Sequence, residues 1–229
     1  MLNPFSKTRR YITYAQELKK FCERYPNDIY KVIEEVVDHR KFTMVQKRYE
    51  IYKLLRLINQ KKPKTICDIG SAGGGTLRLF CHYAHPQARI ITIDLNNNTL
   101  RQKSYPHLAQ KGQQITIFQG SSYDPKTIDY VKQWLRNELF DFVFIDGDHE
   151  YDGVKKDFLA YSALTNKGGL IGFHDIVPDH KTVHGSATPG YAGGVHKLWE
   201  ELRLKYPEHE EFIQDSDQDG QGIGLIHWK

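Results

Sequence analysis

The chain has 229 residues, 39% of them hydrophobic, which is enough for one α/β domain with an additional segment. Its 32 basic and 28 acidic residues give a net charge of +4, too small and too evenly spread to indicate a nucleic-acid partner. No apolar run approaches the roughly 20 residues of a membrane span, no signal-peptide segment is evident, and the three cysteines show no CxxC spacing. We therefore expect a cytoplasmic protein without a disulfide framework or a membrane partner.

The N-terminal segment predicts three helices. Apolar residues recur at helical spacing from Ile12 to Cys22, and Pro26 interrupts the pattern. Further helices are expected at 29–39 and 45–58, and in the last helix one face is predicted to carry Val45, Tyr49, Tyr52 and Leu55. We interpret residues 1–62 as a cap over one sheet edge; the alternatives are a dimerisation element, giving a homo-oligomer, or a lid over a substrate.

The segment that follows, KTICDIGSAGGGT at 64–76, predicts a buried strand at 65–69, a glycine-rich turn and a helix at 76–84. Such a turn brings bare backbone and the N–H groups of a helix N-terminus close to a ligand. Its spacing fits neither the dinucleotide fingerprint nor the P-loop, and leaves acidic-x-Gly-x-x-x-Gly at Asp68, Gly70 and Gly74. We interpret it as the nucleotide-cofactor turn of a doubly wound α/β domain; the alternative is a turn that only tightens a loop.

From residue 63 to the end at 229, strand and helix patterns alternate, which is typical of a parallel sheet. Strands are predicted at 89–94, 114–119, 140–146 and 170–173, and helices at 97–111, 125–137, 151–164 and 195–205. Residues 211–228 hold two strand-like pieces around a polar turn. The long loop at 175–194 is expected to form a lid over an acceptor, with His184 and Tyr191 as candidate contacts.

Polar residues follow the ends of these predicted strands. Asp94 ends the second strand, where doubly wound folds place an acidic residue that accepts hydrogen bonds from ribose hydroxyls. Gly120 and Ser121 follow the third strand. The alternative for Asp94 is an ordinary residue of a strand-ending turn.

The stretch FDFVFIDGDHEYDGVKKDF at 140–158 delivers Asp146 and His149 to the end of the fourth strand, and the next strand delivers His174 and Asp175 to the same edge. Asp146 and Asp175 supply oxygen ligands suited to Mg²⁺, Mn²⁺ or Ca²⁺. Histidine side chains titrate close to neutral pH, so His149 suits a general base acting on a hydroxyl group. The alternatives are turn residues at Asp146 and a satisfied buried histidine at His174.

The acidic-x-Gly-x-x-x-Gly turn resembles motif I of class I S-adenosylmethionine (SAM) methyltransferases. Over residues 60–205, FIDGDHEYDGVKKDF, KGGLIGFHDI and GVHKLWEEL are similar to the cephalosporin hydroxylase-like and macrolide-sugar O-methyltransferases. The resemblance implies a Rossmann-like, mostly parallel seven-stranded sheet with an N-terminal helical extension, and SAM as cofactor. It implies cofactor binding by eight residues: Asp68, Gly70, Ser71, Gly74, Asp94, Gly120, Ser121 and Asp146.

In metal-dependent relatives, the strand-four aspartate and an acidic pair after strand five bind Mg²⁺, which implies Asp146 and Asp175 here, with His149 as base. His174 replaces the second acid of that pair and tilts the preference toward Mn²⁺, Fe²⁺ or Zn²⁺. The resemblance thus implies an O-methyltransferase for a small polar or sugar-containing acceptor, and leaves metal dependence open. Two alternatives remain: a non-haem Fe(II) oxygenase that uses His149, His174 and one aspartate, and a non-catalytic SAM-binding protein.

Overall fold

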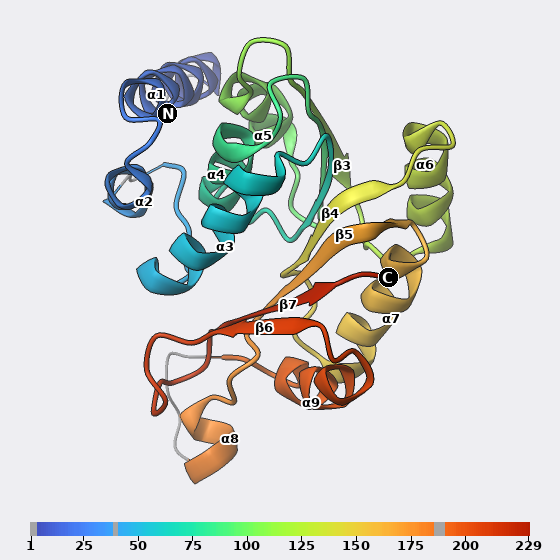
Figure 1. Ribbon diagram of the computed structural model, residues 1–229. Helices are drawn as coiled ribbons and strands as arrows, with labels where there is room; N and C mark the ends of the chain where they lie inside the picture. The colour runs from blue at the N-terminus through green and yellow to red at the C-terminus, as the bar shows by residue number, and fades with distance from the viewer. Residues whose placement is uncertain (1–3, 39–40, 186–190) are drawn as a thin grey trace.

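The computed structural model describes residues 4–38, 41–185 and 191–229. At its centre is a seven-stranded sheet with the strand order β3-β2-β1-β4-β5-β7-β6 (Figure 1). The strands are β1 (Thr65–Ile69), β2 (Arg89–Asp94), β3 (Gln114–Gln119), β4 (Phe140–Ile145), β5 (Thr165–His174), β6 (His209–Phe212) and β7 (Ile223–His227). Strands β1 to β5 run parallel, and β7 is antiparallel to both β5 and β6. The predicted doubly wound, mostly parallel seven-stranded sheet is confirmed.

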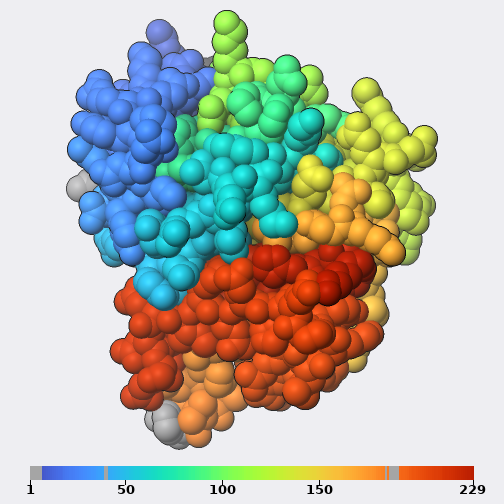
Figure 2. Space-filling model, viewed as in Figure 1, coloured from blue at the N-terminus to red at the C-terminus, as the bar shows by residue number. Residues whose placement is uncertain are grey.

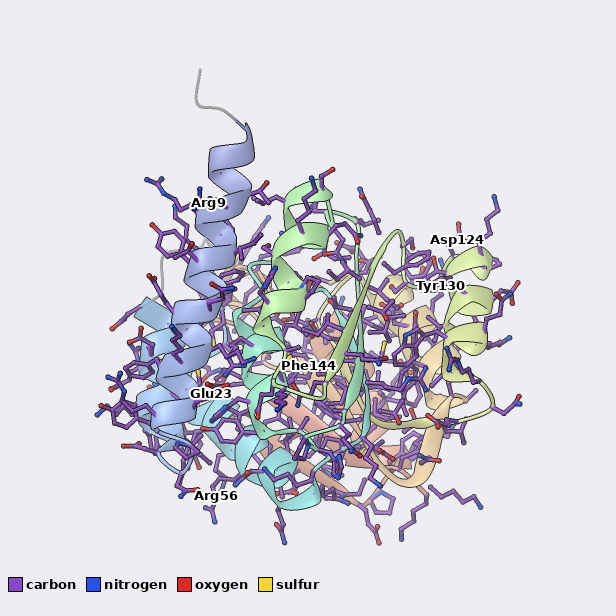
Figure 3. All side chains as sticks on the ribbon, turned by 90° about the horizontal axis from the view of Figure 1, so that it is seen from above. Arg9, Glu23, Arg56, Asp124, Tyr130 and Phe144 are labelled. Carbon is purple, nitrogen blue, oxygen red and sulfur yellow. The ribbon has the colours of Figure 1, made fainter. Side chains whose placement is uncertain are left out.

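Helices cover both faces of the sheet because its buried strands alternate their side chains between the two faces. In β4, Phe142 and Phe144 join the core with α1 (Pro4–Arg24), α2 (Ile29–Asp38), α3 (Arg48–Lys61), α4 (Gly75–Tyr83) and the 3₁₀ helix η1 (Tyr105–Leu108). Val143 and Ile145 join the core with α6 (Pro125–Leu135), α7 (Tyr151–Ser162) and α9 (Val195–Lys205). Figure 3 shows Phe144 between α1, marked by Arg9 and Glu23, and α6, marked by Asp124 and Tyr130.

The N-terminal helices share the first of these cores, where α1 packs on η1 and α2 packs on α3 and α4. The interpretation of residues 1–62 as a cap stays a prediction. The predicted face of the third helix is wrong in part. Val45 is 67% exposed and precedes α3, Tyr49 is 40% exposed, and the apolar side chains that α3 buries are Ile51, Leu54, Leu55 and Ile58. Helix α3 contacts β6 and β7, so the last helix of the N-terminal segment adjoins the C-terminal strands, as the cyan and red parts of Figure 2 show.

Three further elements differ from expectation. The helix expected at 97–111 is a short α5 (Thr99–Ser104) followed by η1, because Pro106 cannot donate the backbone hydrogen bond that continues an α-helix. The expected loop at 175–194 contains α8 (His180–His184), which Asp179 caps by accepting a hydrogen bond from the Thr182 N–H at 2.8 Å. Strand β5 begins before the Gly168-Gly169 turn rather than after it.

Cys22, Cys67 and Cys81 are buried, and none of them forms a disulfide bond. Among the described residues, no helix combines the length and the apolar character needed to cross a membrane.

Candidate active site

The carboxyl ends of the parallel strands meet at one edge of the sheet. Ile69 pairs with Ile93 on one side and with Ile145 on the other, and Ile145 pairs with Phe173. A cavity of about 670 Å³ opens beyond these ends, within the range of roughly 300–1,000 Å³ that is usual for small-molecule sites. Its lining includes Gly70 after β1, Asp94 at the end of β2, Gly120 and Ser121 after β3, Asp146 and His149 after β4, and Tyr191 from the long loop.

The glycine turn serves two purposes. Gly70 has φ +87°, and a Cβ there would lie 1.8 Å from the carbonyl oxygen of Asp146, so only glycine lets β1 and β4 end side by side under the cavity. Gly73 and Gly75 instead make room for the N-terminal extension. A Cβ on Gly73 would lie 2.2 Å from Thr43 Oγ1, and the Gly75 N–H donates to the Thr43 carbonyl at 3.1 Å.

Three of the residues assigned to the cofactor lie beneath the cavity and do not line it: Asp68, Ser71 and Gly74. Asp68 is 1% exposed and accepts a hydrogen bond from Thr92 Oγ1 at 3.3 Å. Burial, assisted by the nearby charge of Asp146, raises the pKa of Asp68 to about 7, although the hydrogen bond from Thr92 opposes this shift. Asp68 therefore supports the turn from below.

Asp94 faces the cavity with its carboxylate already partly engaged. Its Oδ2 accepts a hydrogen bond from the Ala72 N–H at 2.9 Å and lies 3.2 Å from Nη1 of Arg101. Its Oδ1 accepts a hydrogen bond from the Asn96 N–H at 2.7 Å. These contacts fix the side chain at the mouth of the turn and tie the glycine segment to the end of β2.

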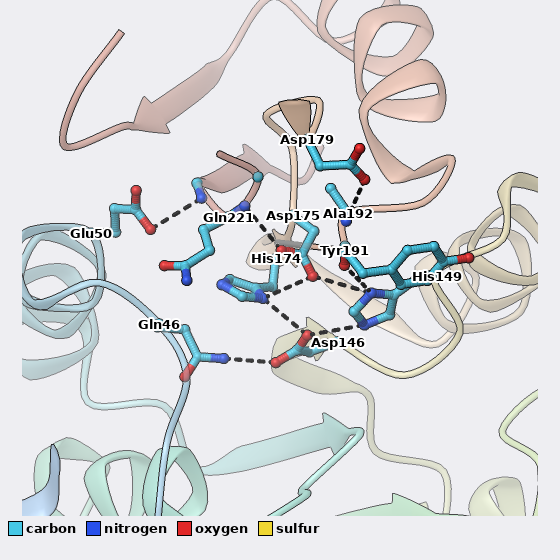
Figure 4. Close-up of polar contacts among 12 residues, drawn as sticks. Gln46, Glu50, Asp146, His149, His174, Asp175, Asp179, Tyr191, Ala192 and Gln221 are labelled. Carbon is cyan, nitrogen blue, oxygen red and sulfur yellow. Dashed lines mark hydrogen bonds and ion pairs between the residues drawn. The ribbon is translucent and has the colours of Figure 1, made fainter. Parts of the chain in front are cut away.

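The four residues predicted for the chemistry come together after β4 and β5 (Figure 4). Ligand atoms of Asp146, His149 and Asp175 all lie within 4.8 Å of one another. His149, the predicted base, therefore lies close enough to both carboxylates for one ion to adjoin all three residues. The carboxylates of Asp146 and Asp175 supply oxygen donors that fit a divalent cation such as Mg²⁺ or Mn²⁺, and His149 stands beside them.

His174 is 3% exposed and bridges the two carboxylates. Its Nδ1 lies 3.1 Å from Asp146 Oδ1 and 3.2 Å from Asp175 Oδ2. Burial alone would lower the pKa of His174, but the charges and hydrogen bonds of Asp146 and Asp175 outweigh it and raise that pKa well above its usual value. Because both oxygens are acceptors, the imidazole Nδ1 acts as a hydrogen-bond donor between the two carboxylates.

The contacts of His149 assign its tautomer. Nδ1 lies 3.1 Å from the Tyr191 carbonyl oxygen and 3.3 Å from Asp175 Oδ2, and both oxygens are acceptors. The hydrogen of a neutral ring therefore belongs on Nδ1, and the lone pair belongs on Nε2. The ring lies parallel to that of Tyr191, with centroids 5.9 Å apart.

The long loop reaches this site in its described part. Asp179 accepts a hydrogen bond from the Ala192 N–H at 3.0 Å, and the Gly194 N–H donates to the His149 carbonyl at 2.7 Å. Residues 186–190 and the side chain of His184 lie outside the described part of the chain, so the predicted lid is described only at its two ends.

Sequence reasoning missed the residues that hold these groups from a distance. Gln46 Nε2 donates to Asp146 Oδ2 at 2.7 Å across 100 positions of sequence, and the Gln221 N–H donates to Asp175 Oδ1 at 3.1 Å. No local pattern links such pairs. One signal was available in Glu50, an acidic residue on the apolar face of α3 that carries Ile51 and Leu54.

The parallel sheet, the glycine turn and the cavity beyond the strand ends place the chain in the class of doubly wound α/β proteins. A sequence profile of the family described as rhamnosyl O-methyltransferase/CmcI matches residues 24–221. The chain belongs to this family, and the family resemblance found in the sequence is confirmed.

The uncharacterized protein R132 of Acanthamoeba polyphaga mimivirus is 30% identical over 155 residues, which is 63% of this chain and 65% of the viral protein. The match thus spans just under two thirds of that relative.

Solved O-methyltransferase structures share the fold. TomG of Streptomyces achromogenes, from tomaymycin synthesis and in complex with SAM, has a TM-score of 0.61 and 15% identity, covering 89% of this chain and 90% of TomG. A putative caffeoyl-CoA O-methyltransferase of Staphylococcus aureus has a TM-score of 0.60 and 21% identity, covering 91% and 98%. MycE of mycinamycin biosynthesis, in complex with Mg, S-adenosylhomocysteine (SAH) and mycinamycin VI, has a TM-score of 0.57 and 19% identity, covering 85% and 54%.

Proposed function

We propose that the protein is a SAM-dependent O-methyltransferase acting on a hydroxyl group of a small polar or sugar-containing acceptor, with a divalent cation assisting. The observation that carries this proposal is the position of His149. It lines the cavity, and its ring stands beside the carboxylates of Asp146 and Asp175 in a chain that belongs to an O-methyltransferase family.

The cofactor is assigned to the side of the cavity formed by β1, β2 and β3. Gly70, Asp94 and Ser121 line that side, and Asp94 is the group expected to accept hydrogen bonds from the ribose hydroxyls. Support comes from TomG, a protein of the same fold that was solved with SAM. We extend the assignment to Gly120 and Asp146, which line the same cavity, and assign supporting positions to Asp68, Ser71 and Gly74.

The chemistry is assigned to the side formed by β4 and β5. Nε2 of His149 accepts the proton of the acceptor hydroxyl as its oxygen attacks the methyl carbon of SAM in line. With SAM bound, the O–CH₃ bond would form while the S–CH₃ bond breaks, and the electron pair of the S–CH₃ bond would remain on sulfur to give SAH. The Nδ1 contacts with Tyr191 and Asp175 keep the ring oriented and stabilise the imidazolium that forms.

A divalent cation bound beside His149 would lower the energetic cost of the negative charge that develops on the acceptor oxygen. Asp146 Oδ1 and Asp175 Oδ2 are the oxygens that face this position, and His174 contacts both of them. MycE, which has the same fold, was solved with Mg. Ligation by the neutral form of His174 would favour binding of Mn²⁺ at least as much as binding of Mg²⁺.

The test is a calorimetric titration of SAM into metal-stripped protein, repeated with Mg²⁺ or Mn²⁺ present. We expect micromolar SAM binding in each case and a separate binding signal for the cation. SAH release is then measured with a panel of rhamnosyl glycosides as acceptors. Absence of SAM binding under all conditions would remove the proposal.

Two other assignments are separated by the same measurements. SAM binding without SAH release from any acceptor would indicate a non-catalytic SAM-binding protein. An Fe(II) oxygenase usually needs two imidazoles and one carboxylate on the ion, and His149 and His174 both lie beside Asp146 and Asp175. Membership of an O-methyltransferase family favours methyl transfer, and an anaerobic Fe²⁺ titration tests the oxygenase assignment. A homo-oligomer formed through the N-terminal helices stays a prediction, which sedimentation of the purified protein would check.

A further inference from the structure

We infer that Gln46 and Glu50, both in the N-terminal extension, are positioning residues for the candidate metal centre. The centre has two carboxylates, Asp146 and Asp175. In each of them one oxygen accepts a hydrogen bond from a residue outside the centre, and the other oxygen faces the centre. The inference rests on the proposed metal-assisted function and adds to it a requirement for the residues that precede the sheet.

Gln46 holds Asp146 directly. The side chain is 5% exposed, and its Nε2 donates to Asp146 Oδ2 at 2.7 Å. Its Oε1 accepts a hydrogen bond from Thr76 Oγ1 at 2.8 Å, in the first turn of α4 after the glycine turn. One amide therefore fixes the strand-four carboxylate relative to the start of the helix that follows the candidate cofactor turn, as its place beside Asp146 in Figure 4 shows.

Glu50 holds Asp175 through the loop between β6 and β7. Its carboxylate is completely buried and accepts hydrogen bonds from three groups of that loop: Gln218 Nε2 at 2.8 Å, the Gly222 N–H at 3.1 Å and the Gln214 N–H at 3.3 Å. The residue before Gly222 is Gln221, whose N–H donates to Asp175 Oδ1 at 3.1 Å. Removing the Glu50 contacts frees the segment that carries this donor.

The hydrogen bonds to Asp146 and Asp175 each leave one carboxylate oxygen facing the centre. With Oδ2 of Asp146 and Oδ1 of Asp175 occupied, the oxygens left inside are Asp146 Oδ1 and Asp175 Oδ2. These are the atoms that contact His174 Nδ1 at 3.1 and 3.2 Å and that lie 3.8 and 3.3 Å from nitrogens of His149. Each carboxylate is thus prepared to give one oxygen to a cation, and partners of this kind orient metal ligands.

The extension is itself fixed against the cofactor turn. The Thr43 carbonyl accepts the Gly75 N–H, and neither Gly73 nor Gly75 has room for a Cβ beside Thr43. Buried amides and carboxylates are unfavourable unless their hydrogen bonds are made, so the partners of Gln46 and Glu50 are well defined in the folded state. The packing of α3 alone does not require the contacts of Glu50, because the other buried residues of this helix, Ile51, Leu54, Leu55 and Ile58, are apolar.

The test compares Gln46→Leu with Gln60→Leu, the same substitution at an exposed position of α3, the helix that begins just after Gln46. Mn²⁺ is titrated calorimetrically into the metal-stripped full chain, and SAM affinity and thermal unfolding are measured on the same samples. Losing an outer partner of a metal ligand typically weakens metal affinity by about 10- to 100-fold. We expect about a tenfold loss for Gln46→Leu, a smaller change in SAM affinity, and wild-type Mn²⁺ binding for Gln60→Leu.

The second arm compares Glu50→Gln with Glu34→Gln, an exposed glutamate of α2. The amide presents an N–H₂ group to donors that need an acceptor, so the β6–β7 loop loses part of its hold on Asp175. We expect Mn²⁺ affinity to fall about threefold to tenfold for Glu50→Gln, since it acts on a ligand only through the loop. The visible absorption spectrum of bound Co²⁺, which reports ligand geometry, should change for Gln46→Leu and Glu50→Gln and not for either control.

The outcomes separate the inference from the function on which it rests. Wild-type Mn²⁺ affinity and an unchanged Co²⁺ spectrum in both variants would overturn the inference and leave the metal site standing. A wild-type chain that binds SAM but neither Mn²⁺ nor Co²⁺ would remove the metal site and the inference together. If Glu50→Gln fails to fold, Gln46→Leu decides the question, with Thr76→Val, which removes only the hydroxyl bonded to Gln46, as its milder companion.

Discussion

The two sides of the cavity are built by different means. The side at β1, β2 and β3 is held by backbone N–H groups of the glycine turn that bind the end of the neighbouring strand: the Gly70 N–H donates to the Ile93 carbonyl, and the Ala72 N–H donates to Asp94 Oδ2 across 22 positions. The side at β4 and β5 is held by contacts that span much of the chain. Gln46 reaches Asp146 across 100 positions, and the Tyr191 carbonyl reaches His149 across 42.

This difference indicates a division of labour. Contacts between neighbouring strand ends give a shape that any chain with the same register and glycines can form, and that shape suits a common cofactor. Contacts between charged side chains and distant segments give an arrangement that depends on the whole fold, which suits chemistry that needs atoms placed within fractions of an ångström. Substitutions on the first side should therefore alter binding, and those on the second side should alter turnover.

The largest effect is expected for His149→Ala, on the side assigned to the chemistry. Loss of a general base typically costs about 10²- to 10⁴-fold in rate, and SAM affinity should change less than about threefold because the cofactor side is untouched. SAH release with a rhamnosyl glycoside acceptor and SAM calorimetry measure the two quantities.

Two controls sharpen this result. His107→Ala removes a histidine that does not line the cavity and should keep wild-type turnover. Added imidazole should restore part of the activity of His149→Ala, because the alanine leaves space for a free base. Wild-type turnover in His149→Ala would show that the base lies elsewhere and that the division between the two sides is wrong.

Gly70→Ala tests the point where the two sides meet. The alanine would have to adopt φ near +87° with its Cβ 1.8 Å from the Asp146 carbonyl oxygen, so strain and overpacking add. We expect a loss of about 3–4 kcal/mol in the free energy of unfolding, measured by urea denaturation. Gly168→Ala is the matched control, because Gly168 also has positive φ but nothing lies within 4 Å of its Cβ position. Equal losses in the two variants would mean that conformational strain alone matters and that the close approach to Asp146 does not.

The same division explains what the sequence could predict. The strand ends, the glycine turn, Asp94 and the cluster of Asp146, His149, His174 and Asp175 follow from local patterns and from the rule that parallel strands end at one edge. The positions of Gln46, Glu50 and Gln221 do not, because a polar residue in a helix or loop has no local signature of its distant partner. The buried face of α3 was misassigned because tyrosines at helical spacing resemble a core stripe, while Ile51, Leu54 and Ile58 form the actual one.

Asp68 gives the cofactor side a pH dependence. A carboxyl whose folded pKa is raised, here to about 7 mainly by burial, contributes stability that is fully present below the unfolded value of about 3.9 and is lost as pH rises through 7. The free energy of unfolding should therefore fall by up to about 1.4 kcal/mol per pH unit between roughly pH 5 and 7 from this group. In Asp68→Asn this slope should be reduced, whereas Asp129→Asn, at an exposed position of α6, should keep it. Parallel slopes in all three proteins would assign the pH dependence to other groups.

The smallest effect is expected for Asp94→Asn, and it decides how far the cofactor side depends on backbone alone. The asparagine can still accept one of the two backbone hydrogen bonds, from Ala72 or Asn96, but it loses the charge beside Arg101 and one acceptor for the ribose hydroxyls. We expect SAM to bind about tenfold more weakly, a change of about 1.4 kcal/mol, with turnover at saturating SAM close to wild type. Asp124→Asn, a conservative change at the N-cap of α6, should leave SAM affinity unchanged.

If Asp94→Asn binds SAM as tightly as the wild type, Asp94 only shapes the turn, and the contrast between a cofactor side built from backbone groups and a chemical side built from side chains becomes stronger. If turnover falls with affinity intact, the two sides are coupled through the glycine turn, and the division drawn between them fails.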